Sequence, residues 1–130
     1  MTSDQRLVKI KGFEDLEIWK EAHKLTVKIY ETTRNFPKDE LYGLISQLRR
    51  SASSVAANIA EGHSRDTTKE FIKFLYNARA SAAETEYHLI LSRDLGYLNV
   101  EEFGELKIRY GVLGKRINAL IGSLKKKSNH

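Results

Sequence analysis

The chain has 130 residues, which is a typical length for one domain. It contains no cysteine, and this excludes a disulfide framework, a thiolate metal site and a cysteine nucleophile. The 22 lysines and arginines outnumber the 17 acidic residues and give a formal net charge of +5, a moderate bias towards anionic partners. With Pro37 as the single proline and 41% hydrophobic residues, the composition favours long, uninterrupted helices.

The sequence shows no targeting or membrane segment. Residues 1–11 lack the apolar run of a signal peptide. The longest uncharged stretch, residues 51–60, is too short to span a bilayer. We therefore expect a cytoplasmic protein without membrane contact. Its expected parts are a basic N-terminal segment over residues 1–13, a helical domain over 14–124 and a basic tail over 125–130.

Helix-stopping and helix-capping residues divide the domain into four segments. The residue before Pro37 is pushed out of the helical region, and Gly62 and Gly96 suit the left-handed conformation found at helix C-termini. Thr67 and Asn99 each stand three residues before a glutamate, which is the pattern of a helix N-cap. We predict four helices, over about residues 14–35, 39–62, 67–95 and 100–125.

Apolar residues in these segments recur at alternating steps of three and four. In the last segment the pattern runs from Phe103 through Leu106 and Leu113 to Leu124. This is the seam of helices packed at shallow angles. Because the connections are short, successive helices are expected to be antiparallel neighbours. The sequence therefore predicts an all-α fold, an antiparallel up-down-up-down four-helix bundle.

The first and fourth segments carry features that favour assembly into a homo-oligomer. The first has two adjacent apolar stripes, one from Leu16 to Tyr30 and one from Ile18 to Ile29, which together cover about 200° of the helix. A deeply buried helix explains this equally well. In the fourth, three glycines fall on a line predicted to face outward, and each interior glycine costs about 1 kcal/mol relative to alanine. Simple tolerance of glycine is the alternative. The candidate oligomer interface is Ile18, Leu25, Ile29, Gly111, Ile121 and Gly122.

Polar residues occupy the middle of the second and third segments. Buried polar groups without partners cost about 1–3 kcal/mol each, so these residues are expected to bond to one another and to fix the register between helices. A polar ligand pocket is the alternative. The predicted structural network, which Arg50 is expected to join, is Gln47, Asn58, Glu61, Ser81 and Glu84.

Motifs of catalysis are absent from the sequence. It has no Glu-x-x-His pair of the kind that builds di-iron bundle sites, no P-loop and no dinucleotide-binding glycine pattern. We therefore expect neither enzymatic activity nor a metal or cofactor.

The charges are expected to separate along the bundle. In an up-down bundle both termini lie at one end together with the loop that holds Arg65, which makes that end basic and the other acidic. A lysine tail often serves solubility alone, and phosphate binding is the alternative. The candidate nucleic-acid contacts are Arg49, Arg50, Arg65, Lys125, Lys126 and Lys127.

Several stretches resemble one known family. They are residues 13–23 (FEDLEIWKEAH), 40–44 (ELYGL), 47–52 (QLRRSA) and 58–62 (NIAEG). Together they resemble the bacterial 23S rRNA intervening-sequence protein family, the "four helix bundle proteins", although Ala80, Tyr87 and His88 depart from its usual pattern. The resemblance implies a ring-shaped homopentamer. A similar group serves as accessory proteins of diversity-generating retroelements, which bind a reverse transcriptase and nucleic acid.

From these observations we expect a non-enzymatic, ring-shaped homo-oligomeric scaffold that binds RNA or DNA non-specifically through basic surfaces. The alternative is a protein adaptor, for example an accessory subunit of a reverse transcriptase or another polymerase.

Overall fold

The computed structural model describes residues 12–128. Four α-helices and two short 3-10 turns make up this part of the chain, which contains no strand. The all-α prediction is therefore confirmed. In chain order the elements are η1 (Phe13–Asp15), α2 (Glu17–Thr33), η2 (Lys38–Glu40), α3 (Leu44–His63), α4 (Thr68–Asp94) and α5 (Val100–Ser128).

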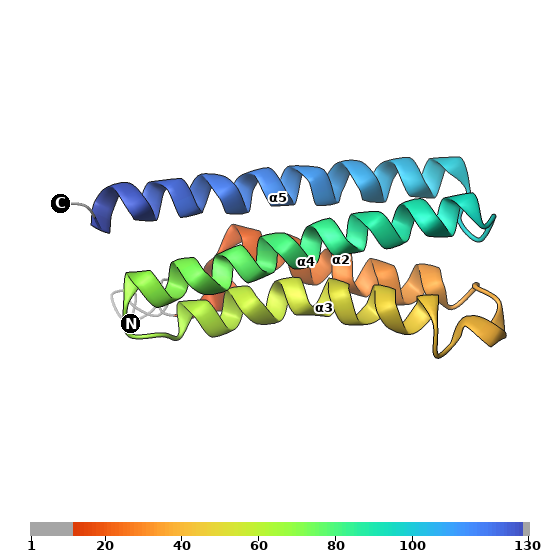
Figure 1. The fold of residues 1–130 in the computed structure, drawn as a ribbon, viewed down its shortest axis with the longest axis horizontal. Helices are drawn as coiled ribbons and strands as arrows, with labels where there is room; N and C mark the ends of the chain where they lie inside the picture. Colours follow the sequence, from red (N-terminus) through yellow and green to blue (C-terminus); the bar gives the residue numbers. More distant parts are fainter. Residues whose placement is uncertain (1–11, 129–130) are drawn as a thin grey trace, which may run out of the picture.

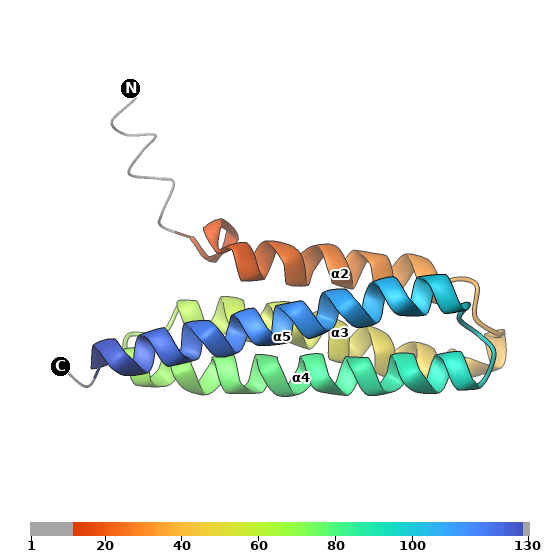
Figure 2. The same cartoon turned by 90° about the horizontal axis from the view of Figure 1, so that it is seen from above.

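The helices run alternately up and down, as Figures 1 and 2 show. Helix α3 packs against α2 and α4, and α5 closes the bundle by packing against α4 and, less extensively, α2. The α3–α4 connection and the end of α5 lie at one end, which we call the terminal end, and the start of α2 points towards this end (Figure 1). The predicted antiparallel four-helix bundle is confirmed. No described helix is long and apolar enough to cross a membrane.

Three of the predicted helix boundaries have the expected local chemistry. The Thr67 hydroxyl accepts a hydrogen bond from the Glu70 amide at 3.1 Å, and the Asn99 side chain accepts one from the Glu102 amide at 2.8 Å. Gly96 ends the third helix with a φ of +81°, a conformation that side chains with a Cβ rarely adopt.

The first two helices begin later than predicted. Leu16 is extended, with φ −75° and ψ 127°, and separates the turn η1 from α2. Gly43, with φ −113° and ψ −111°, separates η2 from α3 in the same way. At the other end of the chain α5 continues to Ser128, so the lysines of the expected tail belong to its last turn. Residues 1–11 of the expected N-terminal segment, and residues 129–130, lie outside the described residues.

Gly62 does not form the predicted helix cap. It lies inside α3, and Gly96 is the glycine with a positive φ in the described part of the chain. A Cβ on Gly62 would lie 2.7 Å from the Cβ of Phe74 and 3.0 Å from Cδ1 of Phe71. Gly62 is thus required because α3 and α4 approach closely at this point, and not because of its own backbone conformation.

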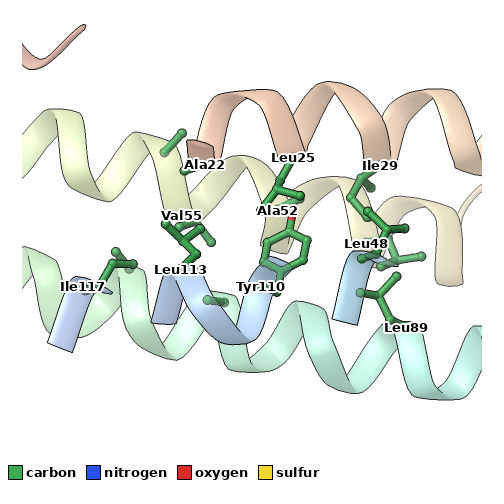
Figure 3. Packing of buried hydrophobic residues seen from close by; sticks show 14 of the residues in the cluster. Ala22, Leu25, Ile29, Leu48, Ala52, Val55, Leu89, Tyr110, Leu113 and Ile117 are labelled. Carbon is green, nitrogen blue, oxygen red and sulfur yellow. The ribbon is translucent and has the colours of Figure 1, made fainter. Parts of the chain in front are cut away.

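The core runs along the axis between the four helices (Figure 3). Tyr110 of α5 reaches into its centre towards Leu25 and Ala52 (Figure 3). Its hydroxyl has no hydrogen-bond partner among the described residues, and burial raises the pKa of the phenol well above its usual value. The other fully buried large side chains include Ile29, Leu48, Ile59, Leu75, Leu89, Leu106, Leu113 and Ile117.

The core also corrects the predicted oligomer interface. Four of its members are buried inside a single subunit, namely Ile18, Leu25, Ile29 and Ile121. The prediction that they face another subunit is wrong, because the second stripe of α2 faces α3 and α5, and Ile121 of α5 belongs to the same core. The first stripe is divided: Leu16 and Trp19 pack against the edge of the core, whereas Val27 and Tyr30 are exposed. Gly111 and Gly122 do lie on open surface, since a Cβ on either would meet no atom within 4 Å.

Two glycine substitutions test the close approach of α3 and α4. Gly62→Ala should lower the free energy of unfolding by about 1–3 kcal/mol, because the added methyl group clashes with Phe74. Gly114→Ala should raise it by up to about 1 kcal/mol, since a Cβ there meets open space and alanine favours the helix. Urea denaturation followed by circular dichroism measures both. Equal stabilisation by the two alanines would contradict the packing described for Gly62.

Candidate functional site

Hydroxyl groups join α3 and α4 in the middle of the bundle. The Thr85 hydroxyl donates to Ser51 Oγ at 2.8 Å, and both side chains are fully buried. One turn further towards the terminal end, the hydroxyls of Ser54 and Ser81 lie 2.9 Å apart. Bonds of this kind stabilise a helix pair only when both partners are in register. Thr85 was not predicted as a member because its spacing places it in the apolar seam.

Most of the predicted polar network exists, with one exception. Arg50 forms an ion pair with Glu84 of α4 and donates to the Gln47 side chain at 2.9 Å. Asn58 donates to the Ser54 carbonyl at 2.8 Å and to its hydroxyl at 3.0 Å.

Glu61 is the exception. Its carboxylate pairs with Arg65 at 2.8 Å, at the surface of the terminal end, and does not join α3 to α4.

The three candidate arginines already have partners within the subunit. Arg49 donates to the Thr33 hydroxyl at 2.9 Å and lies 4.6 Å from the centre of the Tyr30 ring. Arg50 is paired with Glu84, as described above. Arg65 lies 4.8 Å from the centre of the Phe74 ring, in addition to its bond with Glu61.

The predicted nucleic-acid contacts also fall into two groups. Arg49 and Arg50 lie in the first turns of α3, away from the terminal end, whereas Arg65 and the lysines of α5 lie at that end (Figure 1). The structure therefore does not bring the six residues together at one site.

A larger basic surface extends from the terminal end along α4 and α5. Between residues 111 and 128 the sequence contains no acidic residue, and Glu70 is the single acidic residue between 68 and 79. These two stretches lie side by side, since Arg79 donates to Asn118 at 2.6 Å. We call this surface the basic face and define it by six exposed cations, Lys69, Lys73, Arg79, Lys115, Lys125 and Lys126.

An aromatic side chain lies within the basic face. The Tyr76 ring has the Arg79 guanidinium at 4.8 Å and the Lys125 ammonium group at 5.1 Å from its centre. A surface depression of about 510 Å³ adjoins it, lined by one side of α4 from Lys69 to Asn77. The sequence analysis identified Lys125 and Lys126 but missed Lys115 and the α4 half, because Lys69 and Lys73 are far from the C-terminal lysines in the chain.

The arrangement of exposed cations suits electrostatic binding of an anion. Among residues 12–128, no group of three or more histidines, cysteines and acidic residues is placed to hold a metal ion. The described part of the molecule is thus an antiparallel bundle that carries the basic face, with hydroxyl groups bonded between α3 and α4.

Comparison with known proteins gives the family. The model of the 23S rRNA-intervening sequence protein family matches residues 14–119, and the chain belongs to this family. A crystal structure of a protein of unknown function from the S23 ribosomal protein family of Bacteroides thetaiotaomicron is also similar. The two are 25% identical, the match covers 80% of this chain and 97% of the other, and the TM-score is 0.73. No curated protein matches.

A double-mutant cycle tests whether Ser51 and Thr85 stabilise the bundle as a pair. Thr85→Val should lower the free energy of unfolding by about 1 kcal/mol, because it removes the buried inter-helix bond. Ser51→Ala combined with Thr85→Val should cost less than the sum of the two single changes. Ser53→Ala serves as the control, since Ser53 bonds only to the Arg50 carbonyl of its own helix and should be additive with Thr85→Val. Additivity in both cycles would show that Ser51 and Thr85 act independently.

Proposed function

We propose that this protein is a cytoplasmic, non-catalytic scaffold that assembles into a homo-oligomer and binds RNA or single-stranded DNA through phosphate contacts. The observation that supports nucleic-acid binding is the basic face. Its cations come from two helices and are exposed. Within the two stretches that carry them, residues 68–79 and 111–128, Glu70 is the single acidic residue. A surface of this kind attracts a polyanion without reading its sequence.

Ion pairs within the subunit favour the cations of the basic face over Arg50 and Arg65 as contacts for nucleic acid. An arginine that already bonds a carboxylate inside the subunit neutralises little additional phosphate charge, and this applies to Arg50 and Arg65. By contrast, no ion pair with a described carboxylate is formed by Lys69 or Lys73. Assembly strengthens such binding, since an oligomer presents several basic faces to one nucleic-acid chain.

The binding mode predicts a particular salt dependence. Each phosphate neutralised by a cation releases counterions, so the logarithm of affinity falls with the logarithm of salt concentration by about 0.7 per contact for a single strand. Lys69→Gln combined with Lys73→Gln should therefore weaken binding and flatten the slope by about 1.4 if both lysines contact phosphate. Fluorescence anisotropy with labelled RNA and single-stranded DNA across a salt series measures both quantities.

A second double variant with the same net charge distinguishes the loss of Lys69 and Lys73 from the loss of two positive charges anywhere in the protein. Lys24→Gln combined with Lys28→Gln removes two positive charges from α2, outside the basic face, and should leave the slope nearly unchanged. Removing residues 125–130 should weaken binding in the same way as the α4 pair without loss of the oligomer. An intact oligomer that does not bind either nucleic acid at low salt would refute the proposal and favour a protein adaptor instead.

A further inference from the structure

Away from the terminal end, a groove with exposed aromatic and cationic residues lies between α2 and α3. Two adjoining depressions of about 400 and about 220 Å³ share Leu41, Ile45 and Arg49. Tyr42 is 93% exposed and Leu41 is 47% exposed, although both are large apolar side chains. We call this the tyrosine–arginine groove and define it by Tyr30, Leu41, Tyr42, Ile45, Arg49 and Arg50.

The charge around this groove is positive. Arg34 and Lys38 line the smaller depression, Arg49 lines both, and no acidic residue lines either of them. The partners of Arg49 are a hydroxyl, a carbonyl and an aromatic ring, and no carboxylate among residues 12–128 forms an ion pair with it. Tyrosine and arginine are, with tryptophan, enriched among the residues that contribute most of the binding energy at protein interfaces. The groove therefore suits an apolar surface that carries carboxylates.

The same chain has such a surface on the first half of α5. Val100, Gly104, Ile108 and Val112 follow one another at steps of four and form a row along the helix, which we call the α5 row. Val100 is 77%, Ile108 68% and Val112 50% exposed. At Gly104 a Cβ would meet no atom within 4 Å, so no described side chain covers the row between Val100 and Ile108 at this position.

Carboxylates flank the α5 row. Glu101, Glu102 and Glu105 are exposed, and none of them forms an ion pair within the described part of the chain. The row and its carboxylates are thus complementary in charge to the groove. They are also complementary in shape, since an exposed helix face is convex where the groove is hollow.

The two surfaces cannot meet within one subunit. Helix α3, which forms one wall of the groove, and helix α5 lie along opposite edges of the bundle (Figure 1). Both surfaces nevertheless lie towards the same end of the molecule, which is opposite the terminal end. A contact between the groove of one copy and the α5 row of the next would therefore place neighbouring bundles side by side.

We propose that the α5 row of one copy of this chain docks into the tyrosine–arginine groove of the next copy. This inference rests on the assembly in the proposed function and names the surfaces that carry it. Because two different surfaces meet, the interface is heterologous, and repeating it closes a ring when the rotation between neighbours allows. Each subunit contributes one groove and one row.

Complementary single variants test this arrangement. Tyr42→Glu places a carboxylate opposite those of the α5 row, and Ile108→Lys places an ammonium group opposite the arginines of the groove. Each variant should reduce the mass measured by light scattering at micromolar concentration to the 14.9 kDa of one subunit. The helical circular dichroism should not change, because both side chains are largely exposed in the subunit.

Mixing the two variants distinguishes a heterologous interface from a symmetric one. The Tyr42→Glu chain keeps an intact α5 row and the Ile108→Lys chain keeps an intact groove, so an equimolar mixture should recover species of at least two subunits. Tyr87→Glu is the matched control, since Tyr87 is 57% exposed on α4 and belongs to neither surface. It should keep the mass of the unmodified protein.

The outcomes separate this inference from the proposed function. An unmodified protein that is monomeric at micromolar concentration would refute the assembly itself. An unmodified oligomer whose mass survives both Tyr42→Glu and Ile108→Lys would refute the docking of α5 in the groove and leave the assembly in place. Loss of assembly in only one variant, or no recovery on mixing, would show that the groove and the α5 row do not bind each other.

Discussion

The close packing of α3 on α4 is the constraint on which the rest of the structure depends. Small side chains meet at this contact, where Ser51 of α3 and Thr85 of α4 are fully buried. Gly62 extends it to the terminal end, where even a methyl group would collide with Phe74. Small residues let two helices approach, but they bury little apolar surface and could slide past one another. The hydroxyl pairs between the two helices remove that freedom, because they form in one register only.

The other two helices are arranged around this pair. Helix α2 is the shortest of the four and covers mainly the part of the bundle away from the terminal end (Figure 2). The first turns of α4 and the last turns of α5 therefore extend beyond it (Figure 2). This is the region that carries most of the basic face. The unequal helix lengths thus leave the cations on a projecting part of the molecule, where a long polyanion can approach them.

The charge distribution on α5 stabilises the helix itself, in addition to its proposed role in binding nucleic acid. Its first turn holds Glu101 and Glu102, and its last turn holds Lys125 to Lys127. Both placements stabilise the helix, because acidic groups favour the positive end of the helix dipole and basic groups the negative end. The dipole acts over one turn at each end and does not explain Lys115 of α5, or Lys69 and Lys73 near the start of α4. For these residues of the basic face, the helix dipole gives no reason.

The sequence by itself determined the class of fold, the order and direction of the helices, and several of their ends. These follow from interactions between residues close in the chain, such as the three-four spacing of apolar residues and the caps at Thr67 and Asn99. Only the tertiary structure decided which side of a helix faces the core. Helix α2 has two adjacent apolar stripes of similar character, and the choice between them depends on α3 and α5, which residues 17–33 cannot encode alone. The role of Gly62 could not be predicted for the same reason, because it depends on Phe74 in another helix. The basic face likewise joins lysines that are some fifty residues apart in the sequence.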